Sequence, residues 1–133
     1  MQEVKYNAVY GRLYILLGIL FSVIFVVGGI ILNDLTIYFN LLASAAIIYI
    51  GNNVLKNPYA KFDAQNIILY SFWGSERHHY TFKKSDLKLK NGRIYLNKEK
   101  LKMNSWFLAK NDWNRILQFY ALKEVTFDQD SLD

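Results

Sequence analysis

The chain lacks cysteine and has a single proline among its 133 residues. Without cysteine it can form no disulfide, no thiolate metal site and no cysteine nucleophile. Its two histidines, His78 and His79, are adjacent, so on a strand they point to opposite faces and cannot share one metal ion. The sequence also has no glycine-rich phosphate loop, no GxSxG elbow and no HExxH motif. We therefore predict a protein without enzymatic activity, cofactor or metal.

Charge is nearly missing from the first half of the chain. The runs 13–33 and 35–55 contain no charged side chain, and Asp34 separates them. Because roughly 20 apolar residues of helix cross a bilayer core, we predict transmembrane helices over about 13–32 and 35–55. The alternatives are buried helices of a soluble protein and a cleaved signal peptide. The rest of the chain is too short to bury a helix that is apolar all round, and signal-peptide apolar regions are shorter than the first run.

Basic residues flank the two apolar runs on one side only. Lys5 and Arg12 precede the first run, Lys56 and Lys61 follow the second, and the intervening turn has no Lys or Arg. The positive-inside rule therefore places both termini in the cytoplasm. The abundance of Asn, Lys, Ile and Tyr indicates an AT-rich bacterial genome. The predicted location is the bacterial inner (plasma) membrane, crossed twice.

Small and polar residues in the two runs predict how the helices pack. Gly18 and Ser22 form a small-xxx-small pair in the first helix. Asn40 and Ser44 are four residues apart, so they share one face of the second helix and can bond to the first. A membrane-protein partner or a second copy of the chain is also a candidate, and packing against partners in a larger complex would use Asn40 and Ser44.

The hydrophobic pattern changes its period after residue 56. Pro58 ends the second helix because its ring clashes with the preceding turn. Short alternating segments between turn residues then predict antiparallel strands at 60–64, 66–71, 78–82, 86–90, 93–97 and 101–104. Asn91-Gly92 predicts a tight hairpin turn, because both residues tolerate positive φ.

A helix closes the pattern over about 112–122. Asn111 is a suitable N-cap, Asp112 complements the helix dipole, and apolar residues from Trp113 to Ala121 follow helical spacing. The predicted fold is therefore α+β, with a transmembrane hairpin at 1–56, a small antiparallel β domain with a C-terminal helix at 57–122, and a loose tail at 123–133.

Three stretches within Asn57–Leu122 carry a family resemblance: NPYAKFDAQNIIL, FKKSDLKLKNGRIYLN and KNDWNRILQFYAL. With the preceding helical hairpin, they resemble bacterial pleckstrin-homology-like (PH-like) membrane proteins. The resemblance implies a bent sheet or partial barrel closed at one end by the C-terminal helix. Some members of that group are linked to self-protection against membrane-active bacteriocins or to envelope stress, so the resemblance also implies such a role.

Basic residues concentrate in the predicted β domain. The candidate lipid- or partner-binding residues are Arg77, Lys83, Lys84, Lys88, Lys90, Arg93, Lys98, Lys100 and Lys102. On one outer surface they would face anionic lipids, which attract each nearby basic residue by about 1 kcal/mol. The alternative is a solvated strand face whose lysines block edge pairing. Nucleic-acid binding is disfavoured, because no recognised module is present and the nearby aromatic residues fit a core.

The leading functional hypothesis is a non-catalytic, membrane-anchored binding or regulatory module. Its basic cytoplasmic domain would contact a protein partner or an anionic lipid at the inner membrane. One alternative is an immunity protein against a membrane-active bacteriocin or toxin. A second alternative is an accessory subunit of a larger membrane complex.

Overall fold

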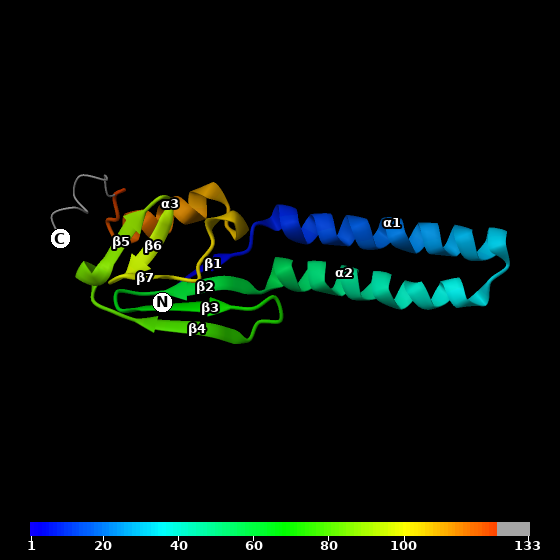
Figure 1. Ribbon diagram of the computed structural model, residues 1–133, viewed down its shortest axis with the longest axis horizontal. Coiled ribbons are helices and arrows are strands. Elements are labelled where there is room, and N and C mark those ends of the chain that lie inside the picture. The colour runs from blue at the N-terminus through cyan, green and yellow to red at the C-terminus, as the bar shows by residue number, and fades with distance from the viewer. Residues whose placement is uncertain (125–133) are drawn as a thin grey trace.

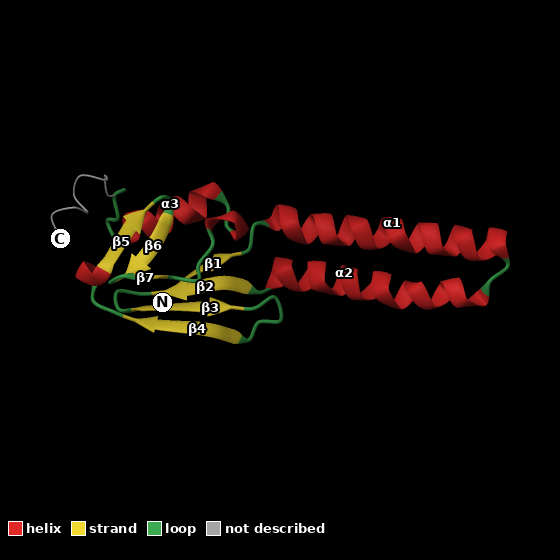
Figure 2. Ribbon diagram, in the orientation of Figure 1, coloured by secondary structure: helices red, strands yellow, loops and turns green. Residues whose placement is uncertain are grey.

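Two long apolar helices and a small α+β domain form the fold in the computed structural model, which describes residues 1–124 (Figures 1 and 2). In chain order the elements are β1 (Gln2–Lys5), α1 (Ala8–Leu32), the 3-10 helix η1 (Leu35–Phe39), α2 (Asn40–Lys56), β2 (Pro58–Phe62), β3 (Asn66–Tyr70), β4 (Glu76–Thr81), the 3-10 helix η2 (Lys84–Asp86), β5 (Leu87–Lys90), β6 (Arg93–Leu96), β7 (Glu99–Lys100), the 3-10 helix η3 (Ser105–Phe107) and α3 (Lys110–Phe119). The predicted α+β class is confirmed.

The helices α1 and α2 lie antiparallel and project from one end of the α+β domain (Figure 1). The helical runs Ala8–Leu32 and Leu35–Lys56, the second joining η1 and α2, are both long and apolar enough to cross a membrane. In each, only 11% of the most apolar window is buried, so the protein itself leaves these surfaces uncovered. α1 begins at Ala8, earlier than predicted, because the side chain of Asn7 caps it by accepting the Val9 N–H at 3.1 Å.

The connection between α1 and α2 contains a short 3-10 helix. Asn33 adopts a left-handed conformation (φ 47°), and Asp34 then caps η1 by accepting the N–H and hydroxyl hydrogens of Thr36 at 2.9 and 2.7 Å. The predicted second span, about 35–55, agrees with the helical run Leu35–Lys56, but its first turn is not α-helical. Residues 35–39 form a tighter 3-10 turn, and α2 starts at Asn40.

Small residues bring the two helices into backbone contact. Gly11 faces Gly51, and Gly18 faces Ser44 and Ile48. Gly11, Gly18, Ser44 and Gly51 are all buried, although most of the apolar side chains of α1 are exposed. Each pair on one helix is seven residues apart, which keeps both on the same seam of a two-helix pair.

The α+β domain contains two antiparallel sheets, with strand orders β1-β2-β3-β4 and β5-β6-β7. The strand β1 was not predicted from the sequence. It pairs with β2, and Glu3 lies opposite Lys61. The strands entering and leaving the helical hairpin are therefore neighbours, and the expected boundary at residue 57 does not separate hairpin from sheet. Within residues 1–124 the two sheets do not join into a closed barrel.

One hydrophobic core joins both sheets and α3. Its most buried large side chains include Phe62 and Ile67 from the first sheet, Ile94 from the second and Ile116 from α3. At the Asn91-Gly92 turn both residues have positive φ, 51° and 68°, which confirms the predicted hairpin.

The C-terminal helix lies two to three residues earlier than predicted. α3 spans Lys110–Phe119, and its N-cap is Ala109 rather than Asn111, which is exposed in the first turn. The predicted apolar stripe is confirmed, because Ile116 and Tyr120 are 0% and 2% exposed. The helix stops because Ala121 takes a left-handed conformation (φ 51°). Most of the expected tail, from residue 125 onward, lies outside the described residues.

Two hydrogen bonds fasten the hairpin to the domain. The Asn7 N–H, just before α1, donates to the Phe107 carbonyl at 2.6 Å. The Asn57 side-chain amide, just after α2, donates to the Phe72 carbonyl at 2.8 Å. Both ends of the hairpin are thereby held against the same side of the domain.

Candidate functional site

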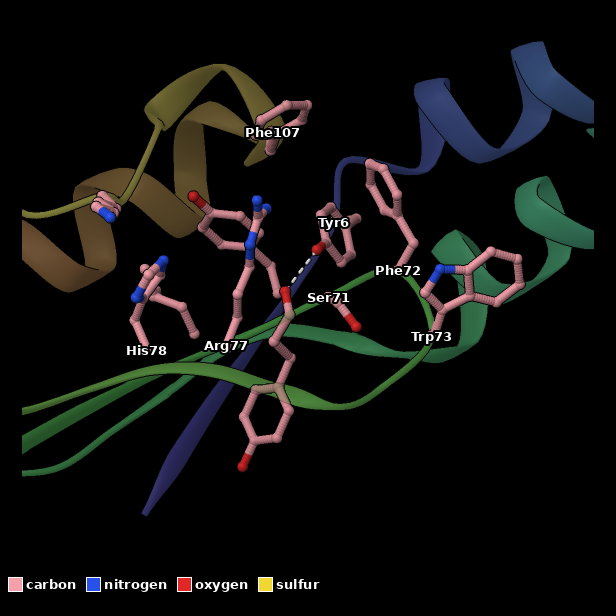
Figure 3. Close-up of a pocket in the computed structure, with 11 residues that line it drawn as sticks. Tyr6, Ser71, Phe72, Trp73, Arg77, His78 and Phe107 are labelled. Atoms are coloured by element: carbon pink, nitrogen blue, oxygen red, sulfur yellow. Dashed lines mark hydrogen bonds between the residues drawn. The ribbon is translucent and has the colours of Figure 1, made fainter.

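A cavity of about 420 Å³ opens where the helical hairpin meets the α+β domain (Figure 3). We call it the basal pocket because it lies at the base of the hairpin. Its lining residues are Tyr6, Tyr59, Leu69, Tyr70, Ser71, Phe72, Trp73, Arg77, His78, Lys102 and Phe107. They come from the link between β1 and α1, from β2, β3 and β4, from the β3–β4 turn and from the segment around η3, so the pocket exists only in the folded domain.

Two irregularities in the sheet bear residues of the basal pocket. In the β1–β2 ladder Val4 pairs with Ala60 and Lys5 with Pro58, which leaves Tyr59 as an extra residue. In the β3–β4 ladder Leu69 pairs with His78 and Tyr70 with Glu76, which leaves Arg77 as an extra residue. A bulge of this kind re-aims a side chain. Tyr59 and Arg77, unpaired in different strands, consequently face one cavity.

Aromatic rings form the floor of the basal pocket. The ring centroid of Tyr6 lies 5.0 Å from that of Tyr59 and 5.0 Å from that of Phe72, and Phe107 lies 6.2 Å away. Burial raises the pKa of Tyr6 to about 12 and also raises the pKa of Tyr59. Both phenols therefore stay neutral, which suits a floor that is largely apolar.

The hydroxyl groups of the floor already have backbone partners. The Tyr6 hydroxyl donates to the Tyr70 carbonyl at 2.7 Å, and the Tyr59 hydroxyl accepts the Asn104 N–H at 2.6 Å. These bonds satisfy polar atoms that burial would otherwise leave without a partner. They also tie the segment before η3 to β2.

Basic groups form the rim of the basal pocket. Figure 3 shows Arg77 and His78 projecting from β4 near Tyr6. The pKa of His78 is lowered by burial and then by the charges of Lys102 and Arg77. Arg77 and Lys102 are therefore close enough to His78 to disfavour its charged form. None of the lining residues is an Asp or Glu. Such a rim attracts an anion.

The edge of the basal pocket reaches toward the apolar part of the hairpin. Trp73, 60% exposed, follows β3, and its ring centroid lies 5.8 Å from that of Tyr49 in α2. Tyr49 lies within the second candidate membrane span. In membrane proteins, Tyr and Trp prefer the interface between lipid and water.

The structure divides the predicted basic surface among several places. Arg77 and Lys102 lie at the basal pocket; Arg93, Lys100 and Lys102 line a second hollow of about 660 Å³; Lys83 and Lys84 lie at the start of η2, Lys88 and Lys90 on β5, and Lys98 in the β6–β7 turn. η2 is at the end of the domain away from α1 and α2 (Figure 1). The nine residues therefore differ in their distance from the hairpin.

The predicted helix-packing residues separate in a similar way. Gly18 and Ser44 are buried between the helices, and Ser22 donates its hydroxyl hydrogen to the Gly18 carbonyl at 2.8 Å. Asn40 is exposed at the start of α2. Its backbone N–H donates to the carbonyls of η1, and its carbonyl accepts the Ser44 hydroxyl hydrogen at 3.5 Å. Over the described range its side chain does not make the expected bond to the first helix, because η1 shifts the start of α2.

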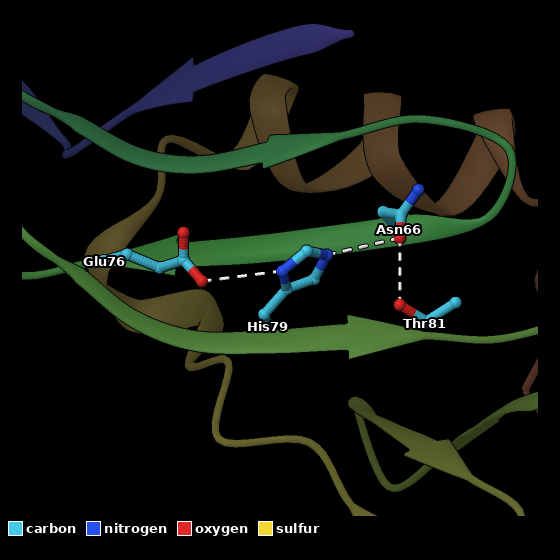
Figure 4. Close-up of polar contacts among 4 residues, drawn as sticks. All are labelled: Asn66, Glu76, His79 and Thr81. Carbon is cyan, nitrogen blue, oxygen red and sulfur yellow. Dashed lines mark hydrogen bonds and ion pairs between the residues drawn. The ribbon is translucent and has the colours of Figure 1, made fainter.

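The two histidines occupy different environments, as predicted. His79 lies outside the basal pocket, where its Nδ1 is 3.5 Å from Glu76 and its Nε2 is 3.2 Å from the Asn66 side-chain oxygen (Figure 4). Thr81 donates to the same oxygen at 3.0 Å. This row links β3 to β4 on an exposed face. Among residues 1–124 no group of three or more His, Asp or Glu side chains is placed to hold a metal ion.

Sequence reasoning missed the aromatic floor. Tyr6 and Tyr59 look like membrane-interface residues when they are read only as neighbours of the apolar runs. The one signal in the sequence is the high share of aromatic residues, 17% of the chain, with Tyr6 and Tyr59 on opposite sides of the apolar runs. The pairing of β1 with β2 is what brings these two rings together.

Comparisons with protein-family models, curated proteins and solved structures find no match to this chain. The resemblance to PH-like membrane proteins therefore stays a prediction from sequence patterns.

Proposed function

We propose that the chain is a non-catalytic binding module anchored in a bacterial inner membrane by α1 and α2. Both termini lie in the cytoplasm in this proposal. The α+β domain rests at the inner surface and recognises an anionic group carried by a lipid or a protein partner. The basal pocket, basic at its rim and placed at the base of the apolar hairpin, is the observation that carries the proposal.

The exposed apolar surface of the hairpin supports the membrane anchor. Large apolar side chains are exposed along α1, among them Leu16, Ile24 and Ile31 at 63%, 51% and 73%. Contiguous apolar surface of this kind in water favours aggregation, whereas lipid tails solvate it. The α1–α2 turn has no Lys or Arg, while Lys5, Arg12, Lys56 and Lys61 flank the other end. That asymmetry supports the cytoplasmic placement of the domain.

Thiol labelling in intact cells tests the anchor. Since the chain has no cysteine, each introduced thiol is the only one. Leu35→Cys, at a position 79% exposed in the interhelical turn, is expected to react with an impermeant maleimide added outside spheroplasts. Ser85→Cys, exposed in η2, is expected to react only after the membrane is opened. The reverse pattern, or equal labelling of both positions before opening, would contradict the proposal.

Immunity against a membrane-active peptide and a place in a larger membrane complex stay predictions from the sequence. No contact among the described residues favours either of them over recognition of an anionic group.

A further inference from the structure

Arg77 is positioned to receive an anion. Across residues 1–124 its side chain makes no ion pair and donates no hydrogen bond, and the same residues give the Lys102 side chain no ion pair. A planar guanidinium with unused N–H groups matches the paired oxygens of a phosphate or carboxylate. The bulge at Arg77 turns this group toward a cavity that holds a second cation and contains no acid.

The position of the basal pocket along the hairpin axis favours a membrane lipid as the source of that anion. Trp73 lines the pocket and contacts Tyr49, about two turns before the end of α2 at Lys56. Those two turns correspond to about 10 Å of helix rise. One wall of the pocket therefore lies beside the last two turns of α2. If the hairpin spans the membrane, phospholipid headgroups lie at this cytoplasmic end.

The lining of the basal pocket favours an amphiphile over a free inorganic anion. The floor residues Tyr6, Tyr59 and Leu69 are 7%, 5% and 4% exposed, whereas Arg77 and Lys102 at the rim are exposed. A small hydrated anion gains nothing from rings and an aliphatic floor. A lipid headgroup can place its phosphate at the rim and its glycerol carbons over the rings. The volume falls within the range of small-molecule sites, roughly 300–1,000 Å³.

The geometry points to the basal pocket as a binding site for the phosphate of one anionic phospholipid, with Arg77 and Lys102 holding the phosphate oxygens and Tyr6 and Tyr59 beneath the glycerol region. This inference rests on the proposed function, because it takes the lipid from the leaflet in which the base of the hairpin sits.

Lipid titration of the full chain in neutral detergent micelles, read by native mass spectrometry, tests the site. The probes are phosphatidylglycerol, phosphatidylcholine and water-soluble glycerol 3-phosphate. We expect phosphatidylglycerol to bind at least about tenfold more tightly than either of the others. Arg77→Gln is expected to weaken its binding by about tenfold, which corresponds to 1.4 kcal/mol, the lower end for a hydrogen bond to a charged group. Arg77→Lys keeps the charge without the planar fork and is expected to lose less.

Lys84→Gln is the matched control, because it removes one positive charge from an exposed position in η2, away from the basal pocket. Its affinity is expected to stay within about twofold of the wild type, since an isolated surface charge contributes little. Thermal unfolding of all variants checks that the fold is retained.

Three outcomes would overturn the inference. Equal losses in Arg77→Gln and Lys84→Gln would show general charge attraction. Equal binding of glycerol 3-phosphate would show a soluble phosphate site, and no preference over phosphatidylcholine would show no anion selection. The thiol labelling is independent of all three, so a failed anchor and a failed lipid site give different results.

Discussion

Gly11 and Gly51 face each other across the helical hairpin so closely that a Cβ atom on Gly51 would lie 2.7 Å from the Gly11 carbonyl oxygen. No side chain fits between these two backbones. The contact lies near the base of the hairpin, so the spacing of α1 and α2 there sets the spacing of the strands that continue from them.

Gly51→Ala is expected to destabilise the hairpin by about 1–3 kcal/mol, because the added methyl group overpacks a backbone contact. Gly28→Ala is the control, since a Cβ at that position meets nothing within 4 Å. Alanine is the better helix former, so the control is expected to be neutral or slightly stabilising. Denaturant unfolding in detergent micelles measures both, and equal stability of the two variants would contradict the close contact.

Ile116→Ala is expected to lower the free energy of unfolding by about 2–5 kcal/mol, the usual range for removing a buried aliphatic side chain. Ile116 is 0% exposed in the core shared by both sheets and α3. Gln118→Ala, on the exposed face of the same helix, is expected to change the value by less than about 0.5 kcal/mol. A small effect of Ile116→Ala would mean that α3 does not close the core.

Asp63→Ala is expected to destabilise the β2–β3 turn at neutral pH. The Asp63 carboxylate accepts the backbone N–H groups of Gln65 and Asn66 at 2.9 and 2.8 Å, and these bonds lower its pKa from the ordinary value of 3.8. A lowered folded-state pKa gives stability that is present above the unfolded value and lost as the pH falls through the folded one.

The stability difference between the wild type and Asp63→Ala should therefore shrink as the pH falls below about 4. Unfolding measured from pH 7 to pH 2 checks this trend. Gln65→Ala serves as the control, because Gln65 enters the turn through its backbone and its side chain is exposed. A difference that does not depend on pH would exclude the charged carboxylate as the stabilising group.

Tyr6→Phe is expected to reduce stability most below pH 10 and progressively less from pH 10 to pH 12. Burial raises the pKa of Tyr6 to about 12 from the ordinary value of 10.0. A raised folded-state pKa gives stability that is complete below the unfolded value and lost as the pH rises through the folded one. Ionised Tyr6 could no longer donate its hydrogen to the Tyr70 carbonyl. Unfolding of both proteins between pH 8 and pH 12 tests this, and a constant difference would contradict it.

The periodic parts of the fold could be predicted from the sequence. The apolar runs gave both helices, the Asn91-Gly92 turn gave the β5–β6 hairpin, and the stripe through Ile116 gave the buried face of α3. Each of these signals is local, because hydrophobic period and turn chemistry act over a few residues.

The missed features depend on contacts between distant residues. Four residues at Gln2–Lys5 are too few to reveal a strand by alternation, and β1 exists because β2, more than fifty positions later, pairs with it. The bulges at Tyr59 and Arg77 are defined by registers between strands, which hydrophobic period does not encode. The basal pocket therefore could not be assembled from the sequence, although Arg77 and Lys102 were among the predicted binding residues.

The pairing of β1 with β2 orders the events of biosynthesis. Since the whole helical hairpin separates these strands in the chain, β1 leaves the ribosome long before its partner exists. If α1 and α2 enter the bilayer during translation, the first sheet closes only after both have been threaded, and the domain matures at the membrane rather than before reaching it. A chain whose helices fail to insert would then also fail to complete its first sheet.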